Sequence, residues 1–384
     1  MDDFRLSWLK FHNFRNYENL ELPEIQNLTI FVGPNAIGKT NIIEGIQLMT
    51  ALESFKNPRV SELMTWGSEG GFLEAGIVSN VRNLSIRLDL KNNRRAYALN
   101  NKRKTATELQ GLLPAVLFSP DDLTLIKGSS HYKRTALDLL GCQLSKTNRV
   151  IKRDYDKLLK HKNSLLKEQG SALLLESVNE LLVQSGLQLY RYRIALFKNM
   201  ATRVLDVYQS ITCGRERVEL SYIPSWENED VKQAASDAPY TPDYDLGDAK
   251  TAFERALSNR GLEEQVRMRA VVGPHADKIE FFIDGKNASL FGSQGQQRSI
   301  VLAWKIAEVG ILQELLGQKP ILLLDDVMSE LDEQRRNSLV ELLLQDIQTF
   351  VTTTDVSFFD PELVDRAHVI RLEEENNGIT FKRS

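Results

Sequence analysis

The sequence predicts an α/β protein that carries a helical insertion, and three features of the chain lead to this prediction. An apolar segment at 27–32 reads as a buried strand and runs into a glycine-rich loop, which a helical pattern follows. A second apolar segment, at 320–326, ends in two aspartates. From about 121 to 210, apolar residues recur at spacings of three and four, as in amphipathic helices. We therefore expect the two ends of the chain to form one α/β unit, with the middle inserted into it.

Alternation of apolar and polar residues, together with turn signals, predicts the other elements. We expect strands at 5–22 (as a pair), 72–79, 84–90, 95–99, 115–118, 268–272, 278–283 and 349–354, and helices at 41–52, from near 295, and at 333–344. Asn100-Asn101 is a candidate hairpin turn that would continue an antiparallel meander. The expected domains are a head made of 1–120 and 268–384, and a helical arm at 121–267. Within the arm, 224–248 has seven acidic residues and one lysine, which predicts an exposed acidic loop.

The composition of the 384 residues is that of a globular protein with a net charge of −4. No apolar run is long enough to span a bilayer, so we expect no membrane partner. Two widely separated cysteines make no disulfide framework, which favours a cytoplasmic location. The net charge excludes a general polyanion binder, so any contact with nucleic acid has to be local. Basic residues gather at 91–105, which has six of them and no acid, and at 145–169, which has eight against three acids.

The glycine-rich loop matches the pattern of a phosphate-binding loop at every fixed position. Its residues are Gly33, Pro34, Asn35, Ala36, Ile37, Gly38, Lys39 and Thr40. The glycines let successive backbone N–H groups point at phosphate oxygens, and the following helix adds the partial positive charge of its N-terminus. Lys39 is expected to contact the β- and γ-phosphates of a nucleotide, and Thr40 to offer its hydroxyl to Mg²⁺.

The aspartates at the end of the second buried strand are the candidates for metal binding and water activation. Asp325 lies at the carboxyl end of the strand, where ligands bind in open α/β sheets, and is expected to hold Mg²⁺. Asp326 is expected to orient or deprotonate the attacking water. With Lys39, these two carboxylates are the predicted catalytic residues.

A third polar motif, GSQGQQR at 292–298, opens the helix before the second buried strand. It resembles the signature motif of ABC ATPases, in which a serine hydroxyl, a glycine N–H and a helix dipole bind a γ-phosphate. In that class the signature contacts the nucleotide held by the opposite protomer. The resemblance implies an ABC-type ATPase head that binds ATP as a homodimer, with Ser293, Gly295 and Gln296 completing the partner's site. Asp332, in a segment that resembles the D-loop, would cross the same interface.

Five strings of the chain carry a further resemblance: GPNAIGKTN, FSPDDL, VVGPHAD, GSQGQQR and LLLDDVMSELDEQRR. Together they resemble the RecF family of bacterial DNA-repair ATPases. The match extends from LKFHNFRNY, near the start of the chain, to the TTT strand. The resemblance implies ATP and Mg²⁺ as cofactors, slow DNA-stimulated ATP hydrolysis, and binding of duplex, junction or single-stranded DNA. It also implies the partners RecR and RecO, RecA loading at gapped DNA and support of the SOS response. Threonines, Thr353 or Thr354, stand at the position of the ABC switch histidine.

Two other readings stay open at this point. One is a RecF- or SMC-like ATPase that gates an effector in a defence system, although no nuclease-like acidic cluster is apparent in the chain. The other is the ATPase subunit of a transporter, which the helical insertion and GSQGQQR, in place of LSGGQ, disfavour.

Overall fold

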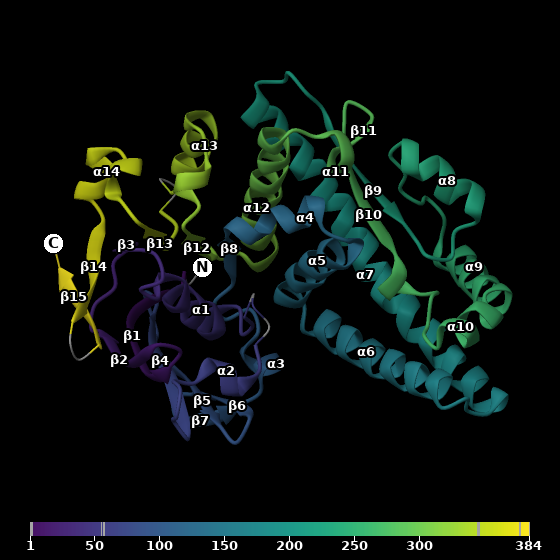
Figure 1. Ribbon diagram of the computed structural model, residues 1–384, viewed down its shortest axis with the longest axis horizontal. Coiled ribbons are helices and arrows are strands. Elements are labelled where there is room, and N and C mark those ends of the chain that lie inside the picture. Colours follow the sequence, from purple (N-terminus) through teal and green to yellow (C-terminus); the bar gives the residue numbers. More distant parts are fainter. Residues whose placement is uncertain (1–2, 55, 57, 344–345, 376–377, 384) are drawn as a thin grey trace. The chain divides into compact units, whose positions relative to one another are not determined.

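The computed structural model describes residues 3–54, 56, 58–343, 346–375 and 378–383. The chain forms two compact units, of which unit 1 comprises 1–121 and 308–384, and unit 2 comprises 122–307 (Figure 1). Within the described residues, no helix combines the length and the apolar character that crossing a bilayer requires.

Unit 1 contains an antiparallel meander. Its strands are β1 (Arg5–Phe14), β2 (Tyr17–Leu22), β4 (Gly70–Val78), β5 (Asn83–Lys91), β6 (Arg94–Leu99) and β7 (Lys102–Lys104), in the order β2-β1-β4-β5-β6-β7. Both turn residues between β6 and β7 have positive φ, 49° at Asn100 and 62° at Asn101. This confirms the predicted hairpin, because a two-residue turn of this kind requires left-handed residues, and asparagine accepts them.

The second sheet of unit 1 is mixed. It contains β3 (Leu28–Val32), β8 (Ala115–Phe118), β12 (Ile321–Asp325), β13 (Thr349–Thr353), β14 (His368–Glu375) and β15 (Gly378–Arg383), in the order β15-β14-β3-β13-β12-β8. All neighbours are parallel except β14 and β15. The carboxyl ends of β3, β13 and β12 therefore meet at one edge of the sheet, which is where the predicted site residues follow the strands.

One apolar core joins the two sheets of unit 1 through α1 (Lys39–Thr50). Phe11 of the meander, Ile43 of α1 and Leu323 of the mixed sheet are all fully buried in it. The remaining helices of the unit are α2 (Val60–Leu63), α3 (Ala106–Leu109), α13 (Glu333–Leu343) and α14 (Pro361–Asp365). Packing α1 against both sheets holds the first turn of this helix, and so the glycine-rich loop, in a fixed position.

Unit 2 is mainly helical. Its helices are α4 (Thr124–Lys127), α5 (Ser130–Leu144), α6 (Lys146–Lys167), α7 (Ala172–Thr212), α8 (Glu229–Asp237), α9 (Leu246–Asn259), α10 (Gly261–Arg267) and α11 (Ala288–Phe291). A small antiparallel sheet consists of β9 (Val218–Ile223), β10 (Lys278–Ile283) and β11 (Lys286–Asn287), in the order β11-β10-β9. The helix α12 (Gln294–Leu316) begins in unit 2 and ends in unit 1.

Three features of the middle of the chain differ from expectation. The chain divides into its two compact units at 307/308, whereas we expected the head to resume at 268; the pairing of β10 with β9 places 278–283 in unit 2. The segment 268–272 is not a strand, since the side chains of Asn163 and Glu264 accept its backbone N–H groups at Ala270 and Val271, at 2.7 and 2.9 Å.

The third difference concerns the acidic stretch 224–248, which contains α8 and the start of α9 and is therefore not one continuous loop. Asn228 and Asp245 cap the two helices with their side chains. Acidic residues lie in the first turn of each helix, where the helix dipole stabilises negative charge. The high acidic content therefore reflects two helix starts rather than an unstructured segment.

Candidate functional site

The glycine-rich loop includes backbone conformations with positive φ, which residues with side chains rarely adopt. Ala36 and Gly38 have positive φ, of 68° and 108°. A Cβ atom on Gly38 would lie 2.3 Å from Nδ2 of Asn16. Any other residue at position 38 would therefore have a strained backbone and no space for its side chain. Together with the start of α1, this tight loop has the geometry of a phosphate-binding cradle.

Lys39 lies inside this loop and is only 6% exposed. Its Nζ donates to the carbonyl oxygens of Gly33, at 2.7 Å, and Pro34, at 3.0 Å. Burial lowers the pKa of the Lys39 amine, while the negative charges of Asp326 and Asp325 act in the opposite direction. The lysine is thus held next to both predicted carboxylates, in the loop where phosphates would bind.

The predicted metal ligands are brought together although they lie at opposite ends of the sequence. Oγ1 of Thr40 donates to Oδ1 of Asp325 at 3.0 Å, across 285 residues. Oγ1 of Thr352 donates to the same oxygen at 2.8 Å. Burial raises the pKa of the Asp325 carboxyl, and the bonds from Thr352 and Thr40 counteract this. A hydroxyl and a carboxylate at this distance are the hard oxygen donors that suit Mg²⁺.

Asp326 follows directly at the end of β12 with a positive φ of 54°. Its N–H donates to Oγ1 of Thr352 at 3.0 Å and to the carbonyl of the same residue at 3.2 Å. The threonine that contacts the two aspartates is therefore Thr352. Oγ1 of Thr353, one of the two threonines expected at the switch position, donates to the carbonyl of Asp355 at 2.8 Å.

Residues of the β1–β2 turn support the loop, and the sequence reasoning did not single them out. Nδ2 of Asn16 donates to the carbonyl of Ile37 at 3.0 Å, and its Oδ1 accepts from Nδ2 of Asn41 at 2.8 Å. Arg15 makes two bonds of 2.8 Å to Glu44, a fully buried carboxylate on α1. The only signal was the NFRNY string, whose asparagine and arginine carry no recognisable spacing relative to the loop.

In unit 2, the signature residues form the N-terminus of α12. The Ser293 N–H donates to Oε1 of Gln296 at 2.7 Å, and the Gln296 N–H donates to Oγ of Ser293 at 3.2 Å, which makes a capping box. Gln296 also donates to Glu216 at 2.9 Å. Ser293 and Gln294 are exposed, whereas Gly295 and Gln296 are half-buried.

Asp332, of the segment that resembles the D-loop, lies in unit 1 just before α13. It accepts the N–H of Arg335 at 3.0 Å and forms an ion pair with the same arginine. Asp332 is exposed, as a residue that contacts a partner would be.

The structure thus gathers Gly33–Thr40, Asp325 and Asp326 at one edge of the mixed sheet of unit 1. Among the described residues, no three His, Cys, Asp or Glu side chains cluster as a metal site. Magnesium at this edge would therefore be held by Thr40, Asp325, water and nucleotide oxygens, which is a common arrangement for this ion. The arrangement can bind a triphosphate and place a carboxylate next to it.

Comparison with known proteins identifies this architecture. The family model described as RecF/RecN/SMC N terminal domain matches residues 5–380. The DNA replication and repair protein RecF of Heliobacterium modesticaldum is 33% identical over 368 residues, which cover 94% of this chain and 95% of that protein. The RecF protein of Bacillus cereus is 31% identical over 96% of both chains.

Solved structures agree with these sequence comparisons. The recombination mediator protein RecF of the RecFOR pathway, solved as RecF-ATP, superimposes with a TM-score of 0.84 at 26% identity and covers 100% of both chains. An Smc head domain from Pyrococcus furiosus, at 15% identity and a TM-score of 0.53 over 99% of this chain and 96% of that chain, shares the fold.

Proposed function

This chain belongs to the RecF family of SMC-related ATPases, and from this premise we propose that it is an ATP-dependent DNA-binding protein of replication and repair. The observation that carries the proposal is the contact between Thr40 and Asp325, at 3.0 Å, beside the buried Lys39. It assembles the phosphate-binding, metal-binding and water-activating groups from the two ends of the chain. The relatives that are called RecF, and the ATP complex of one of them, support ATP as the ligand.

In the proposed complex, Lys39 exchanges its two carbonyl partners for the β- and γ-phosphate oxygens of ATP. Backbone N–H groups of Gly33–Thr40 bind the same phosphates, and the N-terminus of α1 adds a favourable dipole. Mg²⁺, when bound through Thr40 and Asp325, neutralises phosphate charge. Asp326 takes the proton of the attacking water or orients it.

We further propose that Ser293, Gly295, Gln296 and Asp332 complete the ATP site of a second copy of the chain. Ser293 is exposed, and the neighbouring Leu290 and Phe291 expose 75% and 71% of their surface. Exposed apolar side chains next to exposed polar side chains are typical of a protein–protein interface. If trans contacts contribute about 2–3 kcal/mol at each of two sites, ATP strengthens the dimer by about 10³–10⁴. Slow hydrolysis would then act as a timer for the clamped state.

Dimerisation is the test of this part. Light scattering should show a monomer with ADP and a dimer with ATP. Ser293→Arg should bind ATP and stay monomeric, whereas Ser258→Arg, on the exposed face of α9, should dimerise as the wild type does. Lys39→Ala should lose nucleotide affinity. A dimer of Ser293→Arg with ATP would contradict the trans role.

The strongest candidate for the DNA contact is the basic part of the meander. Four exposed cations there have no carboxylate within ion-pair distance in the described part of the chain: Lys91, Arg94, Lys102 and Arg103. Three of them line a cavity of about 440 Å³ with Asp89. On α6, by contrast, several cations are paired with acids, for example Lys152 with Asp156 at 2.6 Å. Unpaired cations are available for phosphate contacts, so the meander is favoured over α6.

Salt dependence tests this surface. The double variant Arg94→Glu/Arg103→Glu should weaken ATP-dependent binding of duplex DNA and reduce the salt slope by about 2. The control Arg191→Glu/Lys250→Glu changes the charge equally on exposed positions of unit 2 and should bind as the wild type does. Equal salt slopes of DNA affinity for the wild type and the two double variants would show that the meander does not contact DNA.

The RecFOR context of the solved relative supports a finer proposal. This chain would act with RecR and RecO, help to load RecA at gapped DNA and support the SOS response, with DNA stimulating its weak ATPase activity. A pull-down on immobilised duplex, single-stranded and gapped DNA in the presence of ATP tests this proposal, and RecR should be recovered together with this protein. Recovery of a defence effector in place of RecR would favour the alternative reading.

A further inference from the structure

A second cavity of the protein lies entirely in unit 2, away from the residues that the proposed function uses. Its volume is about 550 Å³. Its lining includes Ser225, His275 and Ala276, here called its floor, together with residues of α8, of the α9–α10 junction, of α10 and of β10. None of these elements contributes a residue to the proposed ATP site.

The cavity walls are strongly basic. Five cations line the cavity: Lys232, Arg260, Arg267, Arg269 and Lys278. Lys232 pairs with Glu229 at 2.9 Å, and Arg260 and Arg267 share Glu263 at 2.7 and 3.0 Å. Two carboxylates thus face five cations, which leaves an excess of positive charge in one concave space. Such a space concentrates anions, because its walls focus the electric field.

Two of the five cations form no ion pair with a carboxylate in the described part of the chain, although the charge of Lys278 acts on Glu229. In the part of the chain that the structure describes, no carboxylate lies within ion-pair distance of Arg269 or Lys278. Both side chains are exposed, so they can reach a ligand without breaking an existing ion pair. An anion in the cavity would therefore gain their charge at little cost in the protein.

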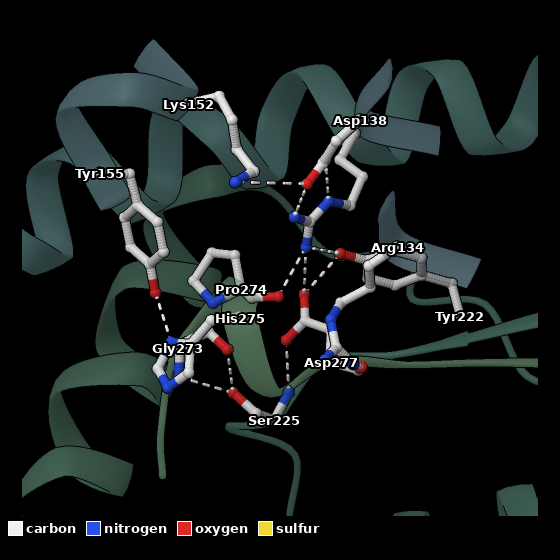
Figure 2. Close-up of polar contacts among 11 residues, drawn as sticks. Arg134, Asp138, Lys152, Tyr155, Tyr222, Ser225, Gly273, Pro274, His275 and Asp277 are labelled. Carbon is white, nitrogen blue, oxygen red and sulfur yellow. Dashed lines mark hydrogen bonds and ion pairs between the residues drawn. The ribbon is translucent and has the colours of Figure 1, made fainter. Parts of the chain in front are cut away.

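Hydrogen bonds hold Ser225 and the segment 273–277, which carries His275 and Ala276 (Figure 2). The Ser225 hydroxyl accepts the N–H of Gly273 at 2.7 Å and donates to the carbonyl of the same residue at 2.9 Å. The Ser225 N–H donates to the fully buried Asp277 at 2.8 Å. Arg193 donates to the Pro274 carbonyl at 2.6 Å. A floor held by this many bonds is preorganised, which lowers the entropic cost of binding.

His275 lines the cavity without adding charge. A tautomer with the proton on Nε2 satisfies both of its contacts, since Nε2 donates to the Ala270 carbonyl at 3.3 Å and Nδ1 accepts the Tyr155 hydroxyl at 2.7 Å. Burial lowers the pKa of His275 to about 4, so the imidazole is neutral at physiological pH. The charge of the cavity therefore comes from its lysines and arginines.

We propose that this cavity is a binding site for a compact oligophosphate anion, which bears several phosphate groups close together. Its volume and its converging cations suit such a ligand, whereas an extended nucleic-acid backbone needs a continuous groove. The described lining residues include no Phe, Tyr or Trp. No Phe, Tyr or Trp ring is thus available to stack a base, and the imidazole of His275 is already engaged with Tyr155 and Ala270, which favours the phosphate part of a ligand over a nucleoside.

Calorimetry with tripolyphosphate at low ionic strength tests the proposal. The phosphate-binding loop is removed as a competing site by using Lys39→Ala as the background. This protein should bind one tripolyphosphate per chain. Adding Arg269→Ala and Lys278→Ala should weaken the binding at least about tenfold, because two charge-assisted contacts are lost. Adding Arg191→Ala and Lys250→Ala, which remove the same charge from exposed positions outside the cavity, should leave the affinity unchanged.

Three results would overturn the proposal. The first is loss of tripolyphosphate binding in Lys39→Ala alone, which would assign all of it to the phosphate-binding loop. The second is equal weakening by the two double substitutions, which would mean general attraction by surface charge. The third is no binding of tripolyphosphate together with weaker DNA binding by Arg269→Ala/Lys278→Ala, which would make the cavity part of a DNA surface. None of these results bears on ATP-driven dimerisation.

Discussion

Replacing Arg193 by methionine probes the buried polar network of unit 2. The guanidinium is almost inaccessible and donates to both carboxylate oxygens of Asp138, at 2.9 Å each. It also donates to the Pro274 carbonyl and lies 3.6 Å from Asp277. The network thus connects α5, α7 and the floor of the basic cavity (Figure 2).

The expected magnitude follows from what the substitution leaves behind. Removing one partner of a buried ion pair costs about 3–5 kcal/mol, because the other charge stays desolvated. Among its ion-pair partners in the described part of the chain, Asp138 would retain Lys152, at 3.9 Å, while Asp277 would retain the Tyr222 hydroxyl and the Ser225 N–H. We therefore expect a loss of about 4 kcal/mol in unit 2. The double variant Arg193→Met/Asp138→Leu should recover part of it, since the stranded carboxylate is gone.

Native-state hydrogen exchange is the suitable assay, because a chain of two compact units need not unfold in one step. The slowest amides of α7 should exchange about a thousandfold faster in Arg193→Met. The amides of β12 and β13 in unit 1 serve as an internal reference. Arg191→Met, on the exposed side of α7, is the matched control and should change little. If the two variants differed by less than about 1 kcal/mol, the network would not be stabilising as reasoned.

Three further predictions concern the histidine, the glycine loop and the second aspartate. The folded pKa of His275 lies below its usual value, at about 4, so its contribution of about 3 kcal/mol to stability is complete above pH 6.5 and is lost as the pH falls from 6.5 to 4. The difference in unfolding free energy between wild type and His275→Gln should follow this window, and a flat difference would contradict it. Gly38→Ala should abolish nucleotide binding and cost about 1–3 kcal/mol of stability. Gly67→Ala is the control, because Gly67 has a φ of 81° but open space around the added Cβ, so its stability should fall only by the cost of backbone strain. Equal nucleotide affinity of the two variants would contradict the proposed clash between a Cβ at position 38 and Asn16. Asp326→Asn keeps a residue that accepts positive φ, so it should bind ATP and accumulate as a dimer while hydrolysis falls by about 10²–10⁴, as an ATPase assay would measure; an unchanged rate would exclude Asp326 as the base.

The sequence alone was sufficient for the features that consecutive residues encode. Gly33–Thr40 lies between a strand and a helix, as expected, because loop, strand and helix follow from local patterns of apolar residues and glycine. The apolar runs before Asp325 and at 349–353 are buried parallel strands, since such runs suit a sheet that is covered on both faces. The Asn100-Asn101 turn formed for the same local reason. Resemblance of motifs, in turn, was sufficient for the family.

Only the tertiary structure decided which distant side chains meet. Thr352 and Asn16 reach the site through contacts between strands and turns far apart in the chain, and a lone threonine or asparagine leaves no periodic signal. The same holds for the division of the chain at 307/308, since the pairing of β9 with β10 places 278–283 in unit 2, and for the basic cavity, whose cations lie on α8, α10, β10 and the segments that flank α10. Sequence patterns indicate which side chains of a segment are buried. Which distant side chains contact one another depends on how the segments pack.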